Sequence, residues 1–326
     1  MLNLKRFNRI ASLAILPLMA LAIVVGAKAA GRAAKAPMPH EGVLVIAQLR
    51  GDALRRYNLG GDGSATNLAL PGPPHEFLAA GGRLYLTLGR ANRVLELEPA
   101  LQGVLRSLPV KGEPNGIALW QNQLLVTLDK GNALVHIDRA ALSETSRDAT
   151  GDTPHNVAVA GDIAYVTNAR DNTVGAVALS GATPALTVPA GTLPESITVA
   201  GDYVVTADAD GGTITIIRRD TFATVGTLAV GSRPVRVLAL DATHVAVALN
   251  GDARVAIIDV PNHSVERRVD VLGRPDGMCI SPAGDYIAVA SNEAGAVQLF
   301  RLRDWALAGA LDAGDGPGAC TWLPAH

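Results

Sequence analysis

Cysteine, aromatic residues and charge are all scarce in this chain of 326 residues. It contains two cysteines, 4% aromatic and 18% charged residues, and its formal net charge is −2. Two cysteines cannot form a disulfide framework, a haem-attachment motif or a cysteine-based zinc site. A net charge near zero excludes a strongly basic nucleic-acid binder. Since 48% of the residues are hydrophobic, there is ample material for a core, and disordered or fibrous classes are excluded as well.

Sequence signatures of several common functions are also missing. No tryptophan is followed by aspartate, which excludes a WD40 repeat. The chain has no Gly-x-Ser-x-Gly nucleophile elbow, no phosphate-binding Gly-x-x-x-x-Gly-Lys loop and no His-Glu-x-x-His zinc helix. Glycine and threonine interrupt every stretch long enough for a helical repeat. Enzyme classes that depend on these motifs are therefore set aside.

The first 29 residues have the order of an export signal. Lys5, Arg6 and Arg9 precede an uncharged run over 10–26, and small residues follow as far as Ala29. This is the order of a secretory signal peptide with its cleavage site. The uncharged run is at the lower limit of the length that spans a bilayer, so an uncleaved anchor also fits. We predict a signal peptide or anchor at 1–29, a linker at 30–41 and a periplasmic or secreted domain at 42–326, which would contact a membrane only if the signal is retained.

One pattern recurs along the rest of the chain, a proline followed by a short apolar segment. Successive prolines are 40 to 42 residues apart, at Pro74, Pro114, Pro154, Pro194, Pro234, Pro275 and Pro317. Each period holds four short segments of strand type, separated by turn residues. Four short strands in about forty residues are typical of a blade of a β-propeller.

The two ends of this repeat complete each other. Before the first proline the chain has three strand-like segments, at 43–47, 54–57 and 66–70, whereas the last proline is followed by only one, at 318–323. We therefore predict an all-β fold, a seven-bladed β-propeller with four-stranded blades. The C-terminal inner strand and the three N-terminal outer strands would form one blade, which removes open edges from the ring.

The repeat resembles a known family. Residues 165–168 read Tyr-Val-Thr-Asn, residues 171–174 read Asp-Asn-Thr-Val, and Gly-x-x-Pro precedes inner strands. These motifs are similar to those of the YVTN-repeat (YncE-like) family of periplasmic and surface-layer β-propellers, over about residues 42–324. The resemblance implies the fold and an exported location. It includes both non-catalytic binding propellers and lactonase-like enzymes, so function has to be argued from the site.

Residues that follow the prolines are expected to form a ring at one mouth of the central channel. The candidate ligand-binding residues of this ring are His75, Glu76, Asn115, His155, Asn156, Glu195, Arg236 and Asp276. His75 and His155 occupy the same position two blades apart, so both imidazoles could reach one ligand. With Glu76 or Glu195 they could hold a divalent metal, or act as acid and base toward a bound substrate, although no cofactor is required. Alternatively, histidines at loop starts only cap turns or bond to a neighbouring blade.

A second series of candidates is cationic. Arg50, Arg90, Lys130 and Arg170 are 40 residues apart, each in the loop after the second strand of a blade, and should lie on the same face as the prolines. A half-ring of cations suits an anionic or zwitterionic ligand. Tandem duplication would also copy a loop residue that has no use.

The two cysteines leave one question open. Cys279 and Cys320 lie four and three residues after their prolines, on adjacent inner strands and with opposite parity. An oxidising compartment would permit a disulfide, but adjacent inner strands could also be too far apart for one.

Together these observations predict an exported binding protein that holds a small molecule, a metal or a peptide at the channel mouth without turnover. One alternative is a lactonase-like hydrolase or lyase that uses His75, His155 and Glu195 with Arg236 as oxyanion stabiliser. Another is a scaffold that docks a protein partner at its rim. We expect a monomer with no nucleic-acid partner.

Overall fold

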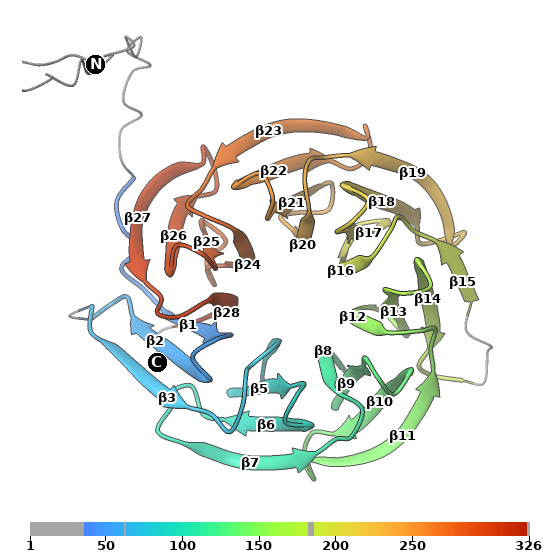
Figure 1. Ribbon diagram of the computed structural model, residues 1–326, viewed down its shortest axis with the longest axis horizontal. Coiled ribbons are helices and arrows are strands. Elements are labelled where there is room, and N and C mark those ends of the chain that lie inside the picture. The colour runs from blue at the N-terminus through green and yellow to red at the C-terminus, as the bar shows by residue number, and fades with distance from the viewer. Residues whose placement is uncertain (1–35, 62, 182–185, 325–326) are drawn as a thin grey trace, which may run out of the picture. The chain divides into compact units, whose positions relative to one another are not determined.

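The computed structural model describes residues 36–61, 63–181 and 186–324. Within these residues the chain forms 28 strands, which pair into seven antiparallel sheets of four strands. Figure 1 shows the sheets arranged as blades around a central axis. The predicted all-β, seven-bladed propeller is therefore confirmed.

Each blade has an inner, a second, a third and an outer strand. The inner strands are β28 (Pro317–Leu323), β4 (Phe77–Ala80), β8 (Pro114–Trp120), β12 (Pro154–Ala160), β16 (Pro194–Ala200), β20 (Pro234–Ala239) and β24 (Pro275–Ile280). The second strands are β1 (Val43–Gln48), β5 (Arg83–Leu88), β9 (Gln123–Leu128), β13 (Ile163–Asn168), β17 (Tyr203–Asp208), β21 (His244–Leu249) and β25 (Tyr286–Ser291).

The remaining two strands of each blade complete the sheet outward. The third strands are β2 (Ala53–Asn58), β6 (Arg93–Leu97), β10 (Ala133–Asp138), β14 (Thr173–Ala178), β18 (Thr213–Arg218), β22 (Arg254–Asp259) and β26 (Ala296–Arg301). The outer strands are β3 (Ala65–Ala69), β7 (Val104–Pro109), β11 (Ser143–Ala149), β15 (Leu186–Pro189), β19 (Ala223–Ala229), β23 (Ser264–Asp270) and β27 (Ala306–Asp312). We number the blades 1 to 7 in the order of these lists.

Blade 1 joins the two ends of the propeller chain. Its strand order is β28-β1-β2-β3, so the C-terminal strand is innermost and the three N-terminal strands follow it outward. Strand β28 pairs antiparallel with β1, and Trp322 lies opposite Leu44. This arrangement agrees with the closure expected from the unequal ends of the repeat.

The hydrophobic core lies between the blades. Second strands are buried on both faces and third strands largely so, whereas outer strands are mostly exposed. In the contact between blades 5 and 6, for example, Val205 and Ile216 pack with Val247 and Ile258. Strands that are covered on both sides need continuous runs of Val, Ile, Leu and Ala, and the sequence supplies such runs in each period.

Asparagine side chains fix the loop that enters several blades. The Oδ1 atoms of Asn92, Asn132 and Asn172 accept hydrogen bonds from backbone N–H groups just before the next proline. The residue before the proline has a positive φ in these loops, for example 58° at Glu113 and 55° at Thr153. Non-glycine residues rarely adopt this conformation, so the asparagine bonds help to hold the backbone in place. The asparagine of the repeat therefore has a structural role.

A disulfide bond ties blade 1 to blade 7. Cys279 of β24 and Cys320 of β28 are bonded, and their Cα atoms are 5.7 Å apart. That separation lies within the usual range for a disulfide, so the adjacent inner strands are close enough. The bond fastens the C-terminal strand that closes the ring.

The segment 36–41 packs against the propeller instead of extending from it. The backbone N–H of Ala36 donates to the carbonyl of Leu307, and the Tyr286 hydroxyl donates to the carbonyl of Pro37. The predicted signal at 1–29 and the first part of the predicted linker lie outside the described residues. No helix within the described ranges is long and apolar enough to cross a membrane.

Candidate functional site

The proline loops and the loops between second and third strands lie on the same face of the propeller. In blade 3 the backbone N–H of Lys130 donates to the carbonyl of Gly112, and in blade 4 that of Arg170 donates to Asp152. Each bond joins the loop before an inner strand to the loop after a second strand. We call this side the proline face.

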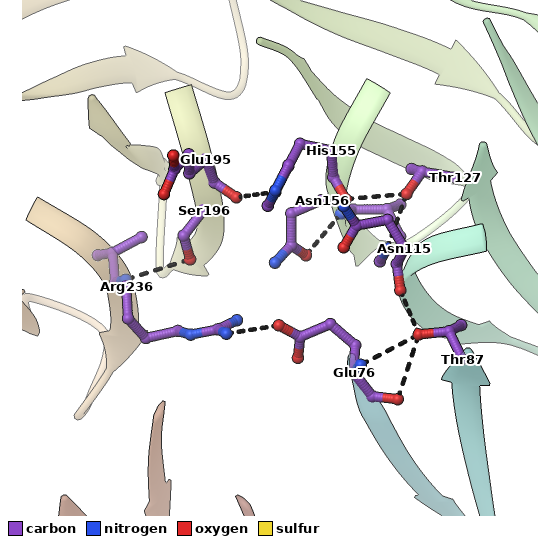
Figure 2. A network of polar contacts seen from close by, with 12 residues as sticks. Glu76, Thr87, Asn115, Thr127, His155, Asn156, Glu195, Ser196 and Arg236 are labelled. Atoms are coloured by element: carbon purple, nitrogen blue, oxygen red, sulfur yellow. Dashed lines mark hydrogen bonds and ion pairs between the residues drawn. The ribbon is translucent and has the colours of Figure 1, made fainter. Parts of the chain in front are cut away.

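Buried threonines position the residues of the proline face. Thr87 accepts a hydrogen bond from the backbone N–H of Glu76 and donates to the carbonyl of Asn115 in the next blade, at 2.6 Å. Thr127 repeats this arrangement and donates to the carbonyl of His155, at 2.9 Å (Figure 2). Each of these threonines therefore fixes its own inner strand relative to the next one.

His75 and His155 meet at the mouth of the channel. Their rings are in edge-to-face contact with centroids 5.7 Å apart. Burial and the nearby charge of Arg236 lower the pKa of His75 to about 4. Burial and the neighbouring His75 likewise lower the pKa of His155 to about 4. Both imidazoles are therefore uncharged at neutral pH.

The two histidines differ in their partners. Nδ1 of His155 bonds to the backbone carbonyl of Glu195 in the next blade, at 2.6 Å. Nδ1 of His75 is buried and has no hydrogen-bond partner among the described residues. His155 thus bonds to a neighbouring blade, which was the alternative interpretation of these histidines. Nδ1 of His75, in contrast, has no partner among the described residues.

An ion pair crosses the channel between blades 2 and 6. Nη2 of Arg236 lies 2.5 Å from Oε1 of Glu76, and the two side chains are only 16% and 14% exposed (Figure 2). Burial opposes the positive charge, but the carboxylates of Glu76 and Asp276 outweigh it and raise the pKa of Arg236. The guanidinium therefore stays charged in the interior of the mouth.

A polar cavity of about 300 Å³ lies at this ion pair, and we call it the first lobe. Its charged and titratable lining residues are His75, His155, Glu195, Arg233, Arg236, Arg274 and Asp276. Burial raises the pKa values of Glu195 and Asp276. The Arg233 guanidinium, 3.6 Å from Glu195, opposes that rise. The first lobe therefore combines three guanidinium groups with two carboxyl groups. Burial disfavours the ionised form of both carboxyl groups.

A second cavity of about 410 Å³ adjoins the first, and we call it the second lobe. Its lining includes His75, Arg50, Arg90, Glu113, Asn115 and Asp129. Nδ2 of Asn115 donates to both carboxylate oxygens of Asp129, each at 3.0 Å. Burial raises the pKa of Asp129 to about 6. Asp129 is not among the residues predicted from the sequence, although it immediately precedes Lys130 of the 40-residue cationic series.

The cationic series proves less uniform than its spacing predicts. Arg50 is paired with Asp315 at 2.8 Å, and Lys130 is paired with Glu113. Arg50 and Arg90 line the second lobe, whereas Lys130 and Arg170 line neither lobe. Acidic partners therefore neutralise two of the four cations. The repeat spacing did not reveal Asp315, because it enters blade 1 from the other end of the chain, 265 residues from Arg50.

Of the other ring residues, some line a lobe and some do not. Glu195, Arg236 and Asp276 line the first lobe, and Asn115 lines the second. Asn156 lines neither lobe, and its Oδ1 accepts a hydrogen bond from the backbone N–H of Val157. Asn156 therefore serves the backbone of β12.

Glu76, a carboxylate of the metal site predicted at the mouth, is paired with Arg236. Among the described residues, His244, Asp259 and Glu266 place three potential ligand atoms within 4.8 Å of one another. Strand β20 begins on the proline face, so the start of β21 at His244 lies on the opposite face. These three side chains could hold a cation there, a grouping that sequence spacing did not indicate.

Comparisons with known proteins identify the fold alone. No protein-family model and no curated protein matches the chain. A functionally unknown protein from Desulfotomaculum acetoxidans superposes with a TM-score of 0.72 at 10% identity, over 87% of this chain and 100% of that one. Apo AztD from Citrobacter koseri gives 0.67 at 11% identity, over 87% and 98%. A catalytically inactive virginiamycin B lyase from Staphylococcus aureus, in a structure with quinupristin, gives 0.65 at 17% identity, over 78% and 94%.

Proposed function

We propose that this protein is an exported member of the YVTN-repeat propellers that binds a small polar ligand at the proline face without converting it. The observation that carries the proposal is a set of unsatisfied polar atoms. Nδ1 of His75, Oδ1 of Asn115 and Nε of Arg236 are buried and lack a hydrogen-bond partner within the described part of the chain. All three residues line the two lobes.

The unsatisfied atoms favour a bound ligand on energetic grounds. A buried donor or acceptor without a partner costs about 1–3 kcal/mol. Three such atoms in two adjoining cavities would therefore be costly to leave unpaired. A ligand that supplies one donor and one acceptor would recover part of that free energy on binding.

The same geometry favours binding over turnover. With pKa values near 4, His75 and His155 are weak bases at neutral pH. Nη2 of Arg236 is paired with Glu76, so the positive charge that would stabilise an oxyanion is partly neutralised.

A lyase or hydrolase is the second candidate. The structurally similar virginiamycin B lyase is described as catalytically inactive when a histidine is replaced by alanine, and its structure holds quinupristin. Here His75 lines the mouth with a free ring nitrogen, so the same cavity could present a base to a substrate. Consumption of a bound compound would favour this candidate.

An exported location is supported by the Cys279–Cys320 bond, because disulfides persist in oxidising compartments. The export signal predicted at 1–29 fits this location. Detection of the protein in the periplasmic fraction or culture medium, with residue 30 at its N-terminus, would test both points.

Thermal melting with a compound panel tests the proposed binding function. The panel contains zinc and magnesium salts with and without EDTA, inorganic phosphate, dicarboxylates, amino acids and short peptides. A ligand at a hundred times its Kd stabilises the folded protein by about 2.7 kcal/mol. At least one class should raise the melting temperature of the wild type and fail to raise that of His75→Ala. NMR spectra of the compound should stay unchanged during incubation.

Asp202→Asn is the matched control, because Asp202 is exposed in the turn before β17 on the opposite face. This variant should respond to the ligand like the wild type. A shift that survives in His75→Ala would place the site elsewhere. A panel without any response would contradict small-ligand binding and favour the docking scaffold.

A further inference from the structure

The two lobes share His75 but offer different chemistry to a ligand. Resting on the proposed function, we infer that the ligand is a short peptide with free ends. Its ammonium group would bind in the second lobe to Asn115 and Asp129, and its carboxylate would bind in the first lobe to Arg236.

Asn115 and Asp129 offer acceptors to a donor with positive charge in the second lobe, which Arg50 and Arg90 also line. Because an ionised carboxylate only accepts hydrogen bonds, the contacts to Asp129 fix the Asn115 amide with Nδ2 toward Asp129. Oδ1 of Asn115 is therefore an acceptor without a partner among the described residues, on a side chain whose residue is only 3% exposed. An ammonium group has three N–H donors, so it can serve Oδ1 and the Asp129 carboxylate together.

Titration of Asp129 agrees with this assignment. Burial raises its pKa to about 6, which means that the surroundings of Asp129 disfavour the carboxylate anion. A bound ammonium would stabilise the anion and release a proton from the fraction of Asp129 that is protonated. Lys130 is paired with Glu113, and its charge opposes the rise in the pKa of Asp129 without overcoming it.

The first lobe is built for an acceptor with negative charge. Nε of Arg236 is a buried donor that lacks a partner in the described structure, while Nη2 of the same group is paired with Glu76. Arg233 and Arg274 also line this cavity, where Arg233 lies near Glu195 and Asp210 and Nε of Arg274 donates to Asn250. Guanidinium groups bind carboxylates with charge-assisted hydrogen bonds, which makes a peptide C-terminus a suitable occupant.

His75 lies where the two lobes meet, and its free Nδ1 can either donate or accept. A neutral imidazole of this kind suits a peptide amide, which has a carbonyl acceptor and an N–H donor. A ligand that reaches both lobes would therefore find a partner for its backbone between them. A peptide carries an ammonium group, an amide and a carboxylate in this order. A simple anion or a metal ion does not.

Calorimetric titration of the purified protein with alanine and its di-, tri- and tetrapeptides tests the inference at about pH 7.5, well above the pKa of Asp129. One of the free-ended peptides should bind. Acetylation of its N-terminus and amidation of its C-terminus should each weaken binding about tenfold or more. Asp129→Asn should weaken binding of the free peptide to a similar degree and should not weaken binding of the acetylated peptide any further. Asp202→Asn should leave both affinities unchanged.

Several results would overturn the inference. Equal affinity for free and capped peptides, no effect of Asp129→Asn, or no binding of any free-ended peptide would each contradict it. If the melting panel still shows another ligand whose effect requires His75, the proposed binding function stands and only the peptide assignment is wrong. If neither experiment finds a ligand, the proposed function itself is contradicted.

Discussion

Replacement of Arg236 by methionine tests the electrostatics of the channel mouth. For charge centres about 4 Å apart, the attraction to Glu76 is worth about 4 kcal/mol at an effective dielectric constant of 20. Loss of one partner from a buried ion pair costs about 3–5 kcal/mol, since the other charge stays buried. The cost should be near the upper end, because Asp276 and Glu195 also lose the cation that faces them.

The pH dependence of Arg236→Met gives the sharper test. Without the guanidinium, the pKa values of Asp276 and Glu195 should rise further above those of the unfolded chain. The folded variant then binds more protons than the unfolded chain, so its stability falls as the pH rises through this window. At pH 8 the melting temperature of the variant should therefore lie about 10 °C below that of the wild type. At pH 5 the difference should be smaller.

Two further variants control this experiment. Glu76→Gln should cost less, about 3 kcal/mol, because Arg236 keeps Asp276 and Glu195 as neighbours. Arg218→Met removes a solvent-exposed ion pair with Asp220 and should hardly change the melting temperature. The reasoning would be refuted if Arg236→Met had the same melting temperature as the wild type at pH 8. It would also be refuted if the variant lost equal stability at both pH values.

Three other predictions concern closure, the disulfide and the histidines. Deletion of Pro317–His326 removes the inner strand of blade 1, so cooperative melting followed by circular dichroism should be lost; a truncated protein that melts within a few degrees of the parent would contradict the closure. Reduction of Cys279–Cys320, which are 41 residues apart, should cost about 4 kcal/mol in urea unfolding. Ellman titration of the denatured, unreduced protein should find no free thiol. His75 and His155 have folded pKa values near 4, below the ordinary 6.5, so stability should fall as the pH drops from 6.5 towards 4. Replacement of both by glutamine should flatten that decline, and an unchanged profile would show that they titrate normally.

The fold follows from features that the sequence carries locally. Prolines at a period of about forty residues mark the start of each blade, and the unequal ends of the repeat predict how blade 1 closes. The same period predicts that His75 and His155 share one face, because equivalent positions of successive blades point in the same direction. These inferences succeed because each blade contacts mainly its neighbours, so that spacing along the chain translates directly into position on the ring.

Which side chains meet was decided only by the tertiary structure. The pairing of Arg236 with Glu76 depends on the width of the channel and on the reach of two long side chains, and neither follows from a 40-residue spacing. The Cys279–Cys320 bond likewise required the distance between adjacent inner strands. The free Oδ1 of Asn115 can be recognised only when every neighbouring partner has been placed, since an unsatisfied atom is a property of its surroundings. The repeat therefore determines the ring on which the candidate residues stand, and the contacts across the ring determine which of their polar atoms lack a partner among the described residues.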